Sequence, residues 1–583
     1  MAWKREHSLI IILMIFRLDQ STVSSKRLTK KPHIILIVAD DLGWNDVSFH
    51  GADQIPTPNI DALAYNGVIL NRHYTLPICT PSRTTLMTGR NAIRDGMQGS
   101  PLRPGEPRGV PLNSTILPEL LRNRGYATHL VGKWHLGYSS LKNTPVYRGF
   151  DTFYGYYNGF ITYFNHTITE KGMVGKDLHR DEFGKLGIDS NYSYFTDLIT
   201  DEAVNIIHKN GNRKPLFLEI AHLAVHASDG EETLEVRNLD EVRSSFPHIK
   251  NPGRQKYAGM IKAMDESVGR VVQSLQQNNM LENSIVIFMS DNGAPTYGVY
   301  ENFGSNYPLR GIKDTMFEGG VRGAACVFSP LIERPARISN GLMHISDWYP
   351  TLYSIAGGDL RHIHNIDGLD QWSMITSGSE SKRRDLLLNI DEARGMEGAI
   401  SGNYKLIRGA KTNGGHYGDS GNDPTYPVYH ANDALTSSAG LAIKKLSRFP
   451  YVSPSKAEEL RKAATIKCNR SNSSIIDCSG SCLFDIINDP CEYKNLIREK
   501  SQVVELLSNK MRYYKSTMVK QTNAQFDPCS EPKNFEDVWM PWRKRNDQDP
   551  SKCDRPDYNF PNKIQIQPCT PNSASSTVKI VLI

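Results

Sequence analysis

The segment L-P-I-C-T-P-S-R-T-T-L-M-T-G-R contains a single cysteine, Cys79, just before a proline and a predicted helix. Pro81 suits the first turn of a helix, where its missing N–H is not needed, and Gly89 can end that helix. Cys79 would then lie at a helix N-terminus, which is electropositive and favours an anion. Arg83 would lie one turn later on the same side. Taken alone, Cys79 also fits a buried thiol or one half of a disulfide.

Oxygen-bearing side chains follow two predicted buried strands. The apolar run I-I-L-I-V leads to Asp40 and Asp41, and the run S-I-V-I-F-M leads to Asp291 and Asn292. In an open α/β sheet, ligands bind at the carboxyl ends of the strands. Adjacent carboxylates repel each other unless a cation lies between them, and hard oxygen ligands suit Ca²⁺ or Mg²⁺. These four residues therefore predict a calcium-like site, although D-D-L-G alone would also fit a plain acidic turn.

Basic side chains follow predicted strands in the same way. The run Y-A-T-H-L-V leads into G-K-W-H-L-G, where Lys133 and His135 can share a face of an extended segment. The run P-L-F-L-E-I-A leads into H-L-A-V-H, with His222 and His226. Lys313 lies on a glycine-flanked loop. A lone Lys or His usually belongs to the solvated surface, but their positions after buried strands indicate a site.

Strands and helices alternate up to about residue 395, which predicts a mostly parallel sheet covered by helices on both faces. The predicted strands in this part are 34–38, 68–74, 126–131, 215–221, 284–289 and 324–328. The composition then changes, with a strand predicted at 399–407, a long loop at 411–436, a strand at 483–487 and a helix at 502–514. We predict a signal peptide at 1–25, a catalytic domain at 30–395, a smaller domain at 396–528 and an irregular, disulfide-pinned tail at 529–583.

Composition excludes several classes of protein. The 583 residues are too many for one ordinary core, and 39% hydrophobic and 22% charged residues are typical of a globular protein. The net charge of +6 is mild, and nothing resembles a nucleic-acid-binding module. The basic N-terminus and the short apolar run Leu9–Phe16 indicate a secretory signal peptide. Because no other long apolar run follows, we expect no membrane span.

Cysteines and glycosylation sequons agree with a secreted chain. Seven of the nine cysteines lie from residue 468 onward, which favours disulfides. A zinc site is the alternative, but no histidine lies among them. Cys326 lies in an apolar run and is predicted to be a buried thiol. Sequons occur at Asn113, Asn165, Asn191, Asn469 and Asn472.

The motif C-x-P-S-R followed by T-G-R resembles the hallmark of the type I sulfatases. Further segments from about residue 32 to 496 resemble family motifs in the same order, including V-A-D-D, G-K-W-H-L-G, S-D-N-G, F-E-G-G-V-R and L-F-D-I-I-N-D-P-C-E-Y-K-N-L. The last of these, together with H-I-S-D-W-Y-P-T-L, D-G-L-D-Q-W and L-L-L-N-I-D, looks most like the arylsulfatase B group, which removes the 4-sulfate of N-acetylgalactosamine in glycosaminoglycans. The resemblance implies an alkaline-phosphatase-like α/β fold with a smaller C-terminal domain that contains an antiparallel sheet.

The resemblance also implies a modified nucleophile and a metal. In that family the cysteine is oxidised to formylglycine by a formylglycine-generating enzyme, and the hydrated aldehyde attacks the sulfate. Cys79 would be that residue. One Ca²⁺ would be bound by four oxygen ligands and the modified cysteine, namely Asp40, Asp41, Asp291, Asn292 and Cys79.

The same transfer by motif gives the remaining roles. Arg83 would bind and orient the hydrate, and Lys133 and Lys313 would grip the sulfate oxygens. His226 would donate a proton to the leaving alcohol. His135 would help to remove a proton so that the sulfated intermediate releases sulfate.

The chain departs from the group at the loops around the site. The histidine segment reads L-A-V-H-A-S, and we choose His226 over His222 because of its place after the apolar strand. The stretch 229–245 is highly charged, and cysteines expected shortly after Gly99 are absent. We therefore expect a sulfatase for N-acetylgalactosamine 4-sulfate in glycosaminoglycans, in a lysosomal or extracellular setting. The alternatives are a sulfatase for a small ester such as a glucosinolate, a related phosphatase or phosphodiesterase, and a non-catalytic binding protein.

Overall fold

The computed structural model describes residues 30–182, 185–298, 300–410, 417–468 and 476–544. The described residues from Lys31 onward belong to one compact unit. The predicted signal peptide, Asn469, Asn472, Cys553 and Cys569 lie outside the described residues. No helix among the described residues is both long enough and apolar enough to cross a membrane.

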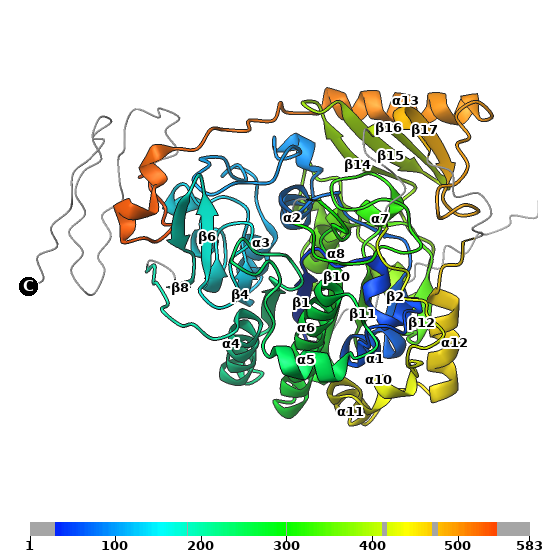
Figure 1. The fold of residues 1–583 in the computed structure, drawn as a ribbon, viewed down its shortest axis with the longest axis horizontal. Coiled ribbons are helices and arrows are strands. Elements are labelled where there is room, and N and C mark those ends of the chain that lie inside the picture. Colours follow the sequence, from blue (N-terminus) through cyan, green and yellow to red (C-terminus); the bar gives the residue numbers. More distant parts are fainter. Residues whose placement is uncertain (1–29, 183–184, 299, 411–416, 469–475, 545–583) are drawn as a thin grey trace, which may run out of the picture. The chain divides into compact units, whose positions relative to one another are not determined.

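The described chain contains a central sheet of nine strands in the order β12-β2-β11-β10-β1-β9-β4-β5-β8 (Figure 1). Their bounds are β1 His33–Ala39, β2 Val68–Leu70, β4 Ala127–Lys133, β5 Thr152–Tyr156, β8 His179–Glu182, β9 Leu216–Ala221, β10 Ser284–Ser290, β11 Ala325–Phe328 and β12 Arg337–Ser339. Strands β10, β1, β9, β4 and β5 pair in parallel, whereas β11 and β8 pair antiparallel to their neighbours. The predicted mixed, mostly parallel sheet is therefore confirmed.

Both faces of the sheet are buried. Ile35 and Ile37 of β1 belong to one large apolar cluster with residues of α1 (Pro58–Asn66), α4 (Phe195–Asn210) and α6 (Pro252–Gln277). Successive side chains of a strand point to opposite faces, and Leu36 and Val38 are equally buried. Three further helices also contact one another, namely α2 (Cys79–Thr88), α3 (Leu117–Asn123) and α8 (Trp348–Ile355). Continuous apolar strands are expected when helices cover both faces.

The strand predicted at 399–407 is wrong, because this segment forms a hairpin. Strand β15 (Met396–Ser401) turns at Gly402, whose φ of 59° favours glycine, and returns as β16 (Tyr404–Ala410). With β14 (Asp385–Asp391) and β17 (Cys478–Asp485), the hairpin forms a four-stranded antiparallel sheet. Helix α13 (Ser501–Ser516) packs on it (Figure 1). The predicted C-terminal antiparallel sheet is confirmed.

Three helices that lie between β16 and β17 were not predicted. They are α10 (Asn432–Thr436), α11 (Ser438–Lys444) and α12 (Pro454–Ala464). Their apolar residues, such as Leu435, Ile443 and Leu460, belong to the same core cluster as α1 and α6. The predicted loop at 411–436 has no helix or strand at 417–431, but it ends in α10. The predicted domain boundaries stay a prediction.

The remaining described elements are short or lie at the edges of the fold. They are β3 His73–Tyr74, β6 Thr167–Glu170, β7 Met173–Lys176, β13 Met343–His344, α5 Leu239–Ser245, α7 Glu318–Val321 and α9 Trp372–Ser377. After α13 the chain runs back to the segments around Gly105 and β7. Asp527 donates its backbone N–H to the Gly105 carbonyl at 2.9 Å. Trp539 donates to the Lys176 carbonyl at 2.9 Å, near β7.

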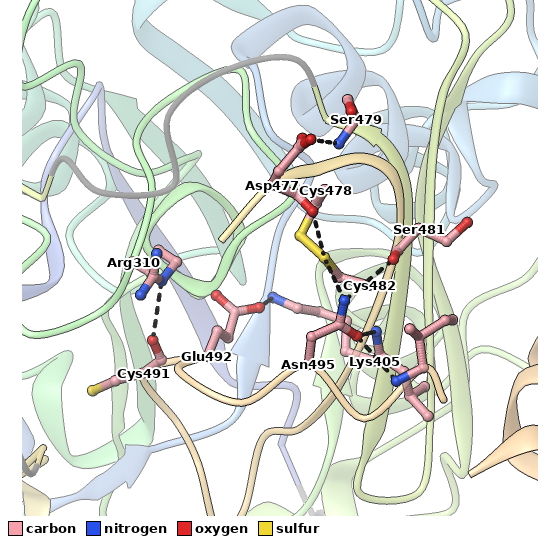
Figure 2. The surroundings of a disulfide bond; sticks show 12 residues. Arg310, Lys405, Asp477, Cys478, Ser479, Ser481, Cys482, Cys491, Glu492 and Asn495 are labelled. Carbon is pink, nitrogen blue, oxygen red and sulfur yellow. Dashed lines mark hydrogen bonds and ion pairs between the residues drawn. A yellow bond between two sulfur atoms is a disulfide. The ribbon is translucent and has the colours of Figure 1, made fainter. Parts of the chain in front are cut away.

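Four of the C-terminal cysteines form two disulfides in the described part of the chain, as predicted. Cys478 and Cys482 are joined within β17 (Figure 2), and Cys468 is joined to Cys491. Pairing removes the thiolates that a zinc site would need, so the zinc alternative is wrong for these four residues. Cys326 is a buried free thiol, which confirms that prediction.

A buried ion cluster connects the C-terminal sheet to the loop that carries Lys313. The Lys405 ammonium, on β16, contacts the carboxylate of Glu492 (Figure 2). It also contacts the carboxylate of Glu318, at 2.9 Å. Glu492 also accepts the backbone N–H of Glu318 at 2.7 Å, at the start of α7. All three charged side chains are fully buried. Burial raises the pKa of Glu492 to about 7, although Lys405 opposes this.

A second contact holds the same loop. Arg310 donates from Nε to the Cys491 carbonyl at 3.4 Å (Figure 2), and its guanidinium lies over the ring of Tyr493. Residues 491–493 of the C-terminal part therefore hold both ends of the segment between Arg310 and Glu318. The motif around Glu492 and the F-E-G-G-V-R motif, far apart in sequence, therefore contact each other in the fold.

We predict that Lys405→Met destabilises the fold by about 3–5 kcal/mol, because it leaves two buried carboxylates without their shared cation. Urea unfolding followed by circular dichroism measures this change. Lys510→Met is the matched control, since Lys510 makes a partly exposed pair with Asp385 that we expect to contribute less than about 1 kcal/mol. Equal losses in the two variants would contradict the assignment.

Candidate active site

The acidic residues meet because their strands are parallel neighbours. Ala39 at the end of β1 is in register with Ser290 at the end of β10, so the residues that follow leave the same edge of the sheet side by side. Asp41 donates its backbone N–H to Asp291 Oδ1 at 3.3 Å. Asn292 donates from Nδ2 to Asp41 Oδ1 at 2.6 Å. The side chains of these residues and of Asp40 are fully buried.

Cys79 is the first residue of α2, as predicted, and Gly89 ends the helix in the left-handed region. The Ser82 hydroxyl fixes the entry to the helix, because it bonds both the N–H and the carbonyl of Leu76 at 2.9 and 3.1 Å. Arg83 reaches the acidic residues from the next turn. Its Nη2 lies 2.9 Å from Asp291 Oδ2.

Two lysines contact the same carboxylates. Lys133 Nζ lies 2.7 Å from Asp40 Oδ2, and Lys313 Nζ lies 2.6 Å from Asp41 Oδ2. The Lys313 loop is held in place by its backbone, because Lys313 donates its N–H to the Ala294 carbonyl at 3.1 Å. The next residue donates to the Pro77 carbonyl at 2.7 Å, which connects this loop to the Cys79 segment.

The two histidines after β9 have different surroundings. His226 Nε2 lies 3.3 Å from Asp41 Oδ2 and 3.3 Å from Lys313 Nζ. Its Nδ1 donates to the Ala227 carbonyl, so Nε2, which points into the cluster, carries a lone pair in the neutral ring and a proton in the charged ring. His222 is buried, and neither of its ring nitrogens has a hydrogen-bond partner among the described residues. The structure therefore brings His226, not His222, to the acidic residues.

His135 lies on the neighbouring strand end. It follows β4 and has a positive φ of 55°. Its Nε2 lies 2.9 Å from the Leu102 carbonyl and must donate to it, because a carbonyl only accepts. The neutral ring then has its lone pair on Nδ1, which is buried and has no hydrogen-bond partner among the described residues. Burial, with Lys133 next in importance, lowers the pKa of His135.

The charges compensate one another in a region from which water is excluded. Burial alone would raise the pKa of Asp40, but Lys133, His226 and Arg83 hold it below its usual value. Burial raises the pKa of the Cys79 thiol, although the lysines oppose this. Burial lowers the pKa of His226, against the effect of the nearby carboxylates.

The oxygen atoms of the cluster fit a hard divalent cation. Asp40 Oδ1 and Asn292 Oδ1 are buried and have no hydrogen-bond partner among the described residues. Ligand atoms of Asp40, Asp41 and His226 lie within 4.8 Å of one another. Buried oxygens without partners are costly unless something binds them, and carboxylate and amide oxygens are the ligands that Ca²⁺ and Mg²⁺ prefer.

Two buried asparagines that support the site were not predicted. Asn302 donates from Nδ2 to the Asp41 and Val225 carbonyls at 2.9 and 3.0 Å, and so connects two strand ends. Asn306 exchanges hydrogen bonds of 2.9 Å with the backbone N–H and carbonyl of Ala294. Both lie in a polar, glycine-containing loop, and nothing in that pattern distinguishes a buried asparagine from a surface one.

Comparisons with known proteins agree with this geometry. Residues 32–358 match the family described as Sulfatase. Arylsulfatase J of Mus musculus is 35% identical over 530 residues, which cover 89% of this chain and 82% of that protein. N-acetylgalactosamine-6-sulfatase of Homo sapiens is 32% identical over 362 residues, or 60% of this chain and 66% of that protein. The crystal structure of Ps i-CgsB, also solved in complex with k-i-k-neocarrahexaose, matches with a TM-score of 0.65 and 26% identity over 85% of this chain and 94% of that one.

We predict that Ca²⁺ stabilises the protein, because it would bind buried oxygens that the unfolded chain does not hold together. At a hundredfold excess over Kd the gain is about 2.7 kcal/mol, seen as a rise in Tm by calorimetry. Asp291→Asn should abolish most of this rise. Asp181→Asn, which changes another buried carboxylate outside the cluster, should keep it. A rise that is unchanged in Asp291→Asn would contradict the site.

Proposed function

We propose a mechanism for this chain, which belongs to the type I sulfatase family and is a sulfuric ester hydrolase: Cys79, oxidised to formylglycine, is the nucleophile that attacks the sulfate ester. The observation that carries this proposal is the position of Cys79. It begins α2, beside Arg83, and both lysines act on its thiol from the buried charge cluster.

We also propose that Asp40, Asp41, Asp291, Asn292 and the modified Cys79 hold one Ca²⁺. A formylglycine supplies a hydrated aldehyde oxygen as the nucleophile, and a bound Ca²⁺ withdraws negative charge from the sulfate. The fit rests on the buried oxygens without partners and on the all-oxygen side-chain donors. These donors favour calcium over zinc, which prefers nitrogen and sulfur.

The cationic side chains suit an anionic substrate. A sulfate ester repels nucleophiles because it is negatively charged, and Lys133 and Lys313 stand where they can neutralise its oxygens. Arg83 orients the nucleophile from one turn along α2. Such fixed charges act strongly in a site that excludes water and need no rearrangement during the reaction. The helix N-terminus at Cys79 adds positive potential at the same place.

Two histidines are placed for the proton transfers. His226, when charged, carries a proton on Nε2 that faces the cluster, and it donates this proton to the leaving alcohol oxygen. The neutral His135 carries its lone pair on Nδ1 and accepts the proton whose removal lets the sulfated intermediate release sulfate and re-form the aldehyde. Proton transfer by positioned side chains of this kind typically contributes a factor of about 10²–10⁴ to the rate.

The proposed substrate is N-acetylgalactosamine 4-sulfate in a glycosaminoglycan. Relatives by name act on the 6-sulfate of the same sugar, and Ps i-CgsB has been solved with a saccharide. A small sulfate ester such as a glucosinolate is the second candidate, favoured by the unusual H-L-A-V-H-A-S loop. We further propose entry into the secretory pathway, to a lysosomal or extracellular destination. This destination rests on the N-terminal sequence, the disulfides and the sequons. On this route a formylglycine-generating enzyme would modify Cys79.

We predict that the purified protein releases sulfate and that Cys79→Ala reduces this rate by about 10⁴-fold or more, since removal of a nucleophile has effects of this size. Sulfate release is measured from a 4-sulfated N-acetylgalactosamine oligosaccharide and from a glucosinolate side by side. Peptide mass spectrometry of the Cys79 segment then tests for the aldehyde.

Cys326→Ala is the matched control, because Cys326 is the other buried free thiol among the described residues. We expect it to keep both activity and modification at position 79. Full activity in Cys79→Ala would overturn the mechanism. Release from the glucosinolate alone would overturn the substrate but keep the reaction.

A further inference from the structure

We propose that Phe160, Tyr300 and Arg103 form a subsite for the leaving alcohol, and that the alcohol it takes is a ring of an anionic saccharide. This inference rests on the proposed function, because it places the leaving group beside His226. It goes further by assigning residues and a chemical class to the part of the substrate that does not react.

The first component is a pair of aromatic rings, Phe160 and Tyr300, that pack against His226, and we call this pair the aromatic wall. The ring of Phe160 stacks on the His226 imidazole, with the centroids 5.0 Å apart and an interplanar angle of 14°. Tyr300 contacts both rings, with its centroid 5.0 Å from Phe160 and 6.0 Å from His226. Phe160 is half-buried and the Tyr300 side chain is exposed. A leaving group that receives its proton from His226 therefore has these two rings as neighbours.

The backbone holds Phe160 in place. Gly159 lies against His135, because a Cβ on it would be 3.0 Å from that ring. The residue pair 159–160 therefore lies against both of the proposed proton-transfer histidines. The preceding Asn158 is fixed by Asp177, which accepts from its backbone N–H at 2.9 Å and from its Nδ2 at 2.8 Å. These contacts hold the backbone that precedes Phe160 in place.

Charges from separate loops surround the Tyr300 phenol. Partial burial and Asp229 raise its pKa, whereas Arg103 and Lys313 act in the opposite direction. Lys313, which we assign to the sulfate, and Arg103, which is on another loop, therefore both act on the Tyr300 phenol. We assign Arg103 to the part of the alcohol that extends beyond the sulfate.

Arg103 is arranged to bind an anion. Its side chain is 70% exposed, yet a buried carboxylate, Glu170, holds it from behind through Nη2 at 2.9 Å and Nε at 3.3 Å. Its remaining nitrogen, Nη1, has no partner among the described residues. The neighbouring Leu102 is tied to the site through His135, and its N–H donates to the Thr80 hydroxyl at 3.1 Å. These contacts anchor the loop that carries Arg103 beside the active site.

These three side chains together favour one class of ligand. An aromatic face packs on the apolar face of a flat ring, and this applies to pyranoses and aryl groups alike. The guanidinium group of an arginine binds a carboxylate or a second sulfate through paired hydrogen bonds. Only an alcohol that carries a second negatively charged group would make this contact. A sulfated sugar linked to a uronic acid meets both conditions, whereas a small aryl or oxime ester meets only the first.

The test compares three substrates of increasing reach: 4-nitrocatechol sulfate, N-acetylgalactosamine 4-sulfate, and the disaccharide in which that sugar is linked to a glucuronate. Arg103→Ala should raise KM for the disaccharide about tenfold and change the other two less than twofold. Tyr300→Ala should raise KM for all three substrates several-fold, because each carries a flat ring that can pack on the phenol. Tyr300→Phe, which keeps the ring, should restore the wild-type value.

Two surface variants serve as matched controls. Arg384→Ala removes an arginine that is 73% exposed and paired with Glu380, and Tyr513→Ala removes an exposed tyrosine of α13. Neither should change any KM. Equal effects of Arg103→Ala on all three substrates, or no effect on any of them, would overturn the subsite while leaving the sulfatase reaction intact. Failure of the wild-type protein to release sulfate from any ester would instead overturn the proposed function.

Discussion

The site depends on the compensation of charge where water is excluded. Asp40, Asp41 and Asp291 bring three negative charges to adjacent strand ends, and Arg83, Lys133 and Lys313 bring three positive charges to the same place. No member could be buried alone, because an isolated ion in such surroundings costs many kcal/mol. Strands β1, β10 and β4, helix α2 and the Lys313 loop therefore have to arrive together. A cluster of this kind leaves the positive groups ready for an anionic substrate once a cation takes over the carboxylates.

A second buried ion cluster performs a different task on the same principle. Lys405 contacts the carboxylates of Glu318 and Glu492, and Glu492 also accepts the backbone N–H of Glu318. Their effect is to make the C-terminal sheet part of the support for the Lys313 loop. In the structural cluster both carboxylates contact the Lys405 ammonium, whereas in the catalytic cluster the buried Asn292 Oδ1 has neither a hydrogen-bond partner nor a cation among the described residues. This difference separates a scaffold from a binding site.

The sequence predicts the residues that chemistry requires better than those that hold them. The predicted oxygen ligands of the metal follow apolar strands, Lys133 ends one, and Cys79 begins a helix; the structure brings them together because parallel strands end at one edge. Lys313 is the exception, since it lies on a glycine-flanked loop. The hairpin at Gly402 was read as one strand, since its two apolar runs are separated by only two residues. Helices α10 to α12 were missed because they are short and partly polar. The supports Asn302 and Asn306 and the wall formed by Phe160 have no local pattern, and their positions come from contacts between distant segments.

The burial of Cys79 has a consequence for the order of events during biosynthesis. Its side chain is 3% exposed in the folded protein, beneath groups that come from as far along the chain as Lys313. An enzyme that oxidises this thiol cannot reach it there and has to act on the chain before it folds. Synthesis at about 5–20 residues per second separates Cys79 from Lys313 by roughly 10–50 s. The long sequence separation within the site thus provides an interval in which the proposed oxidation of Cys79 would take place before the thiol is enclosed.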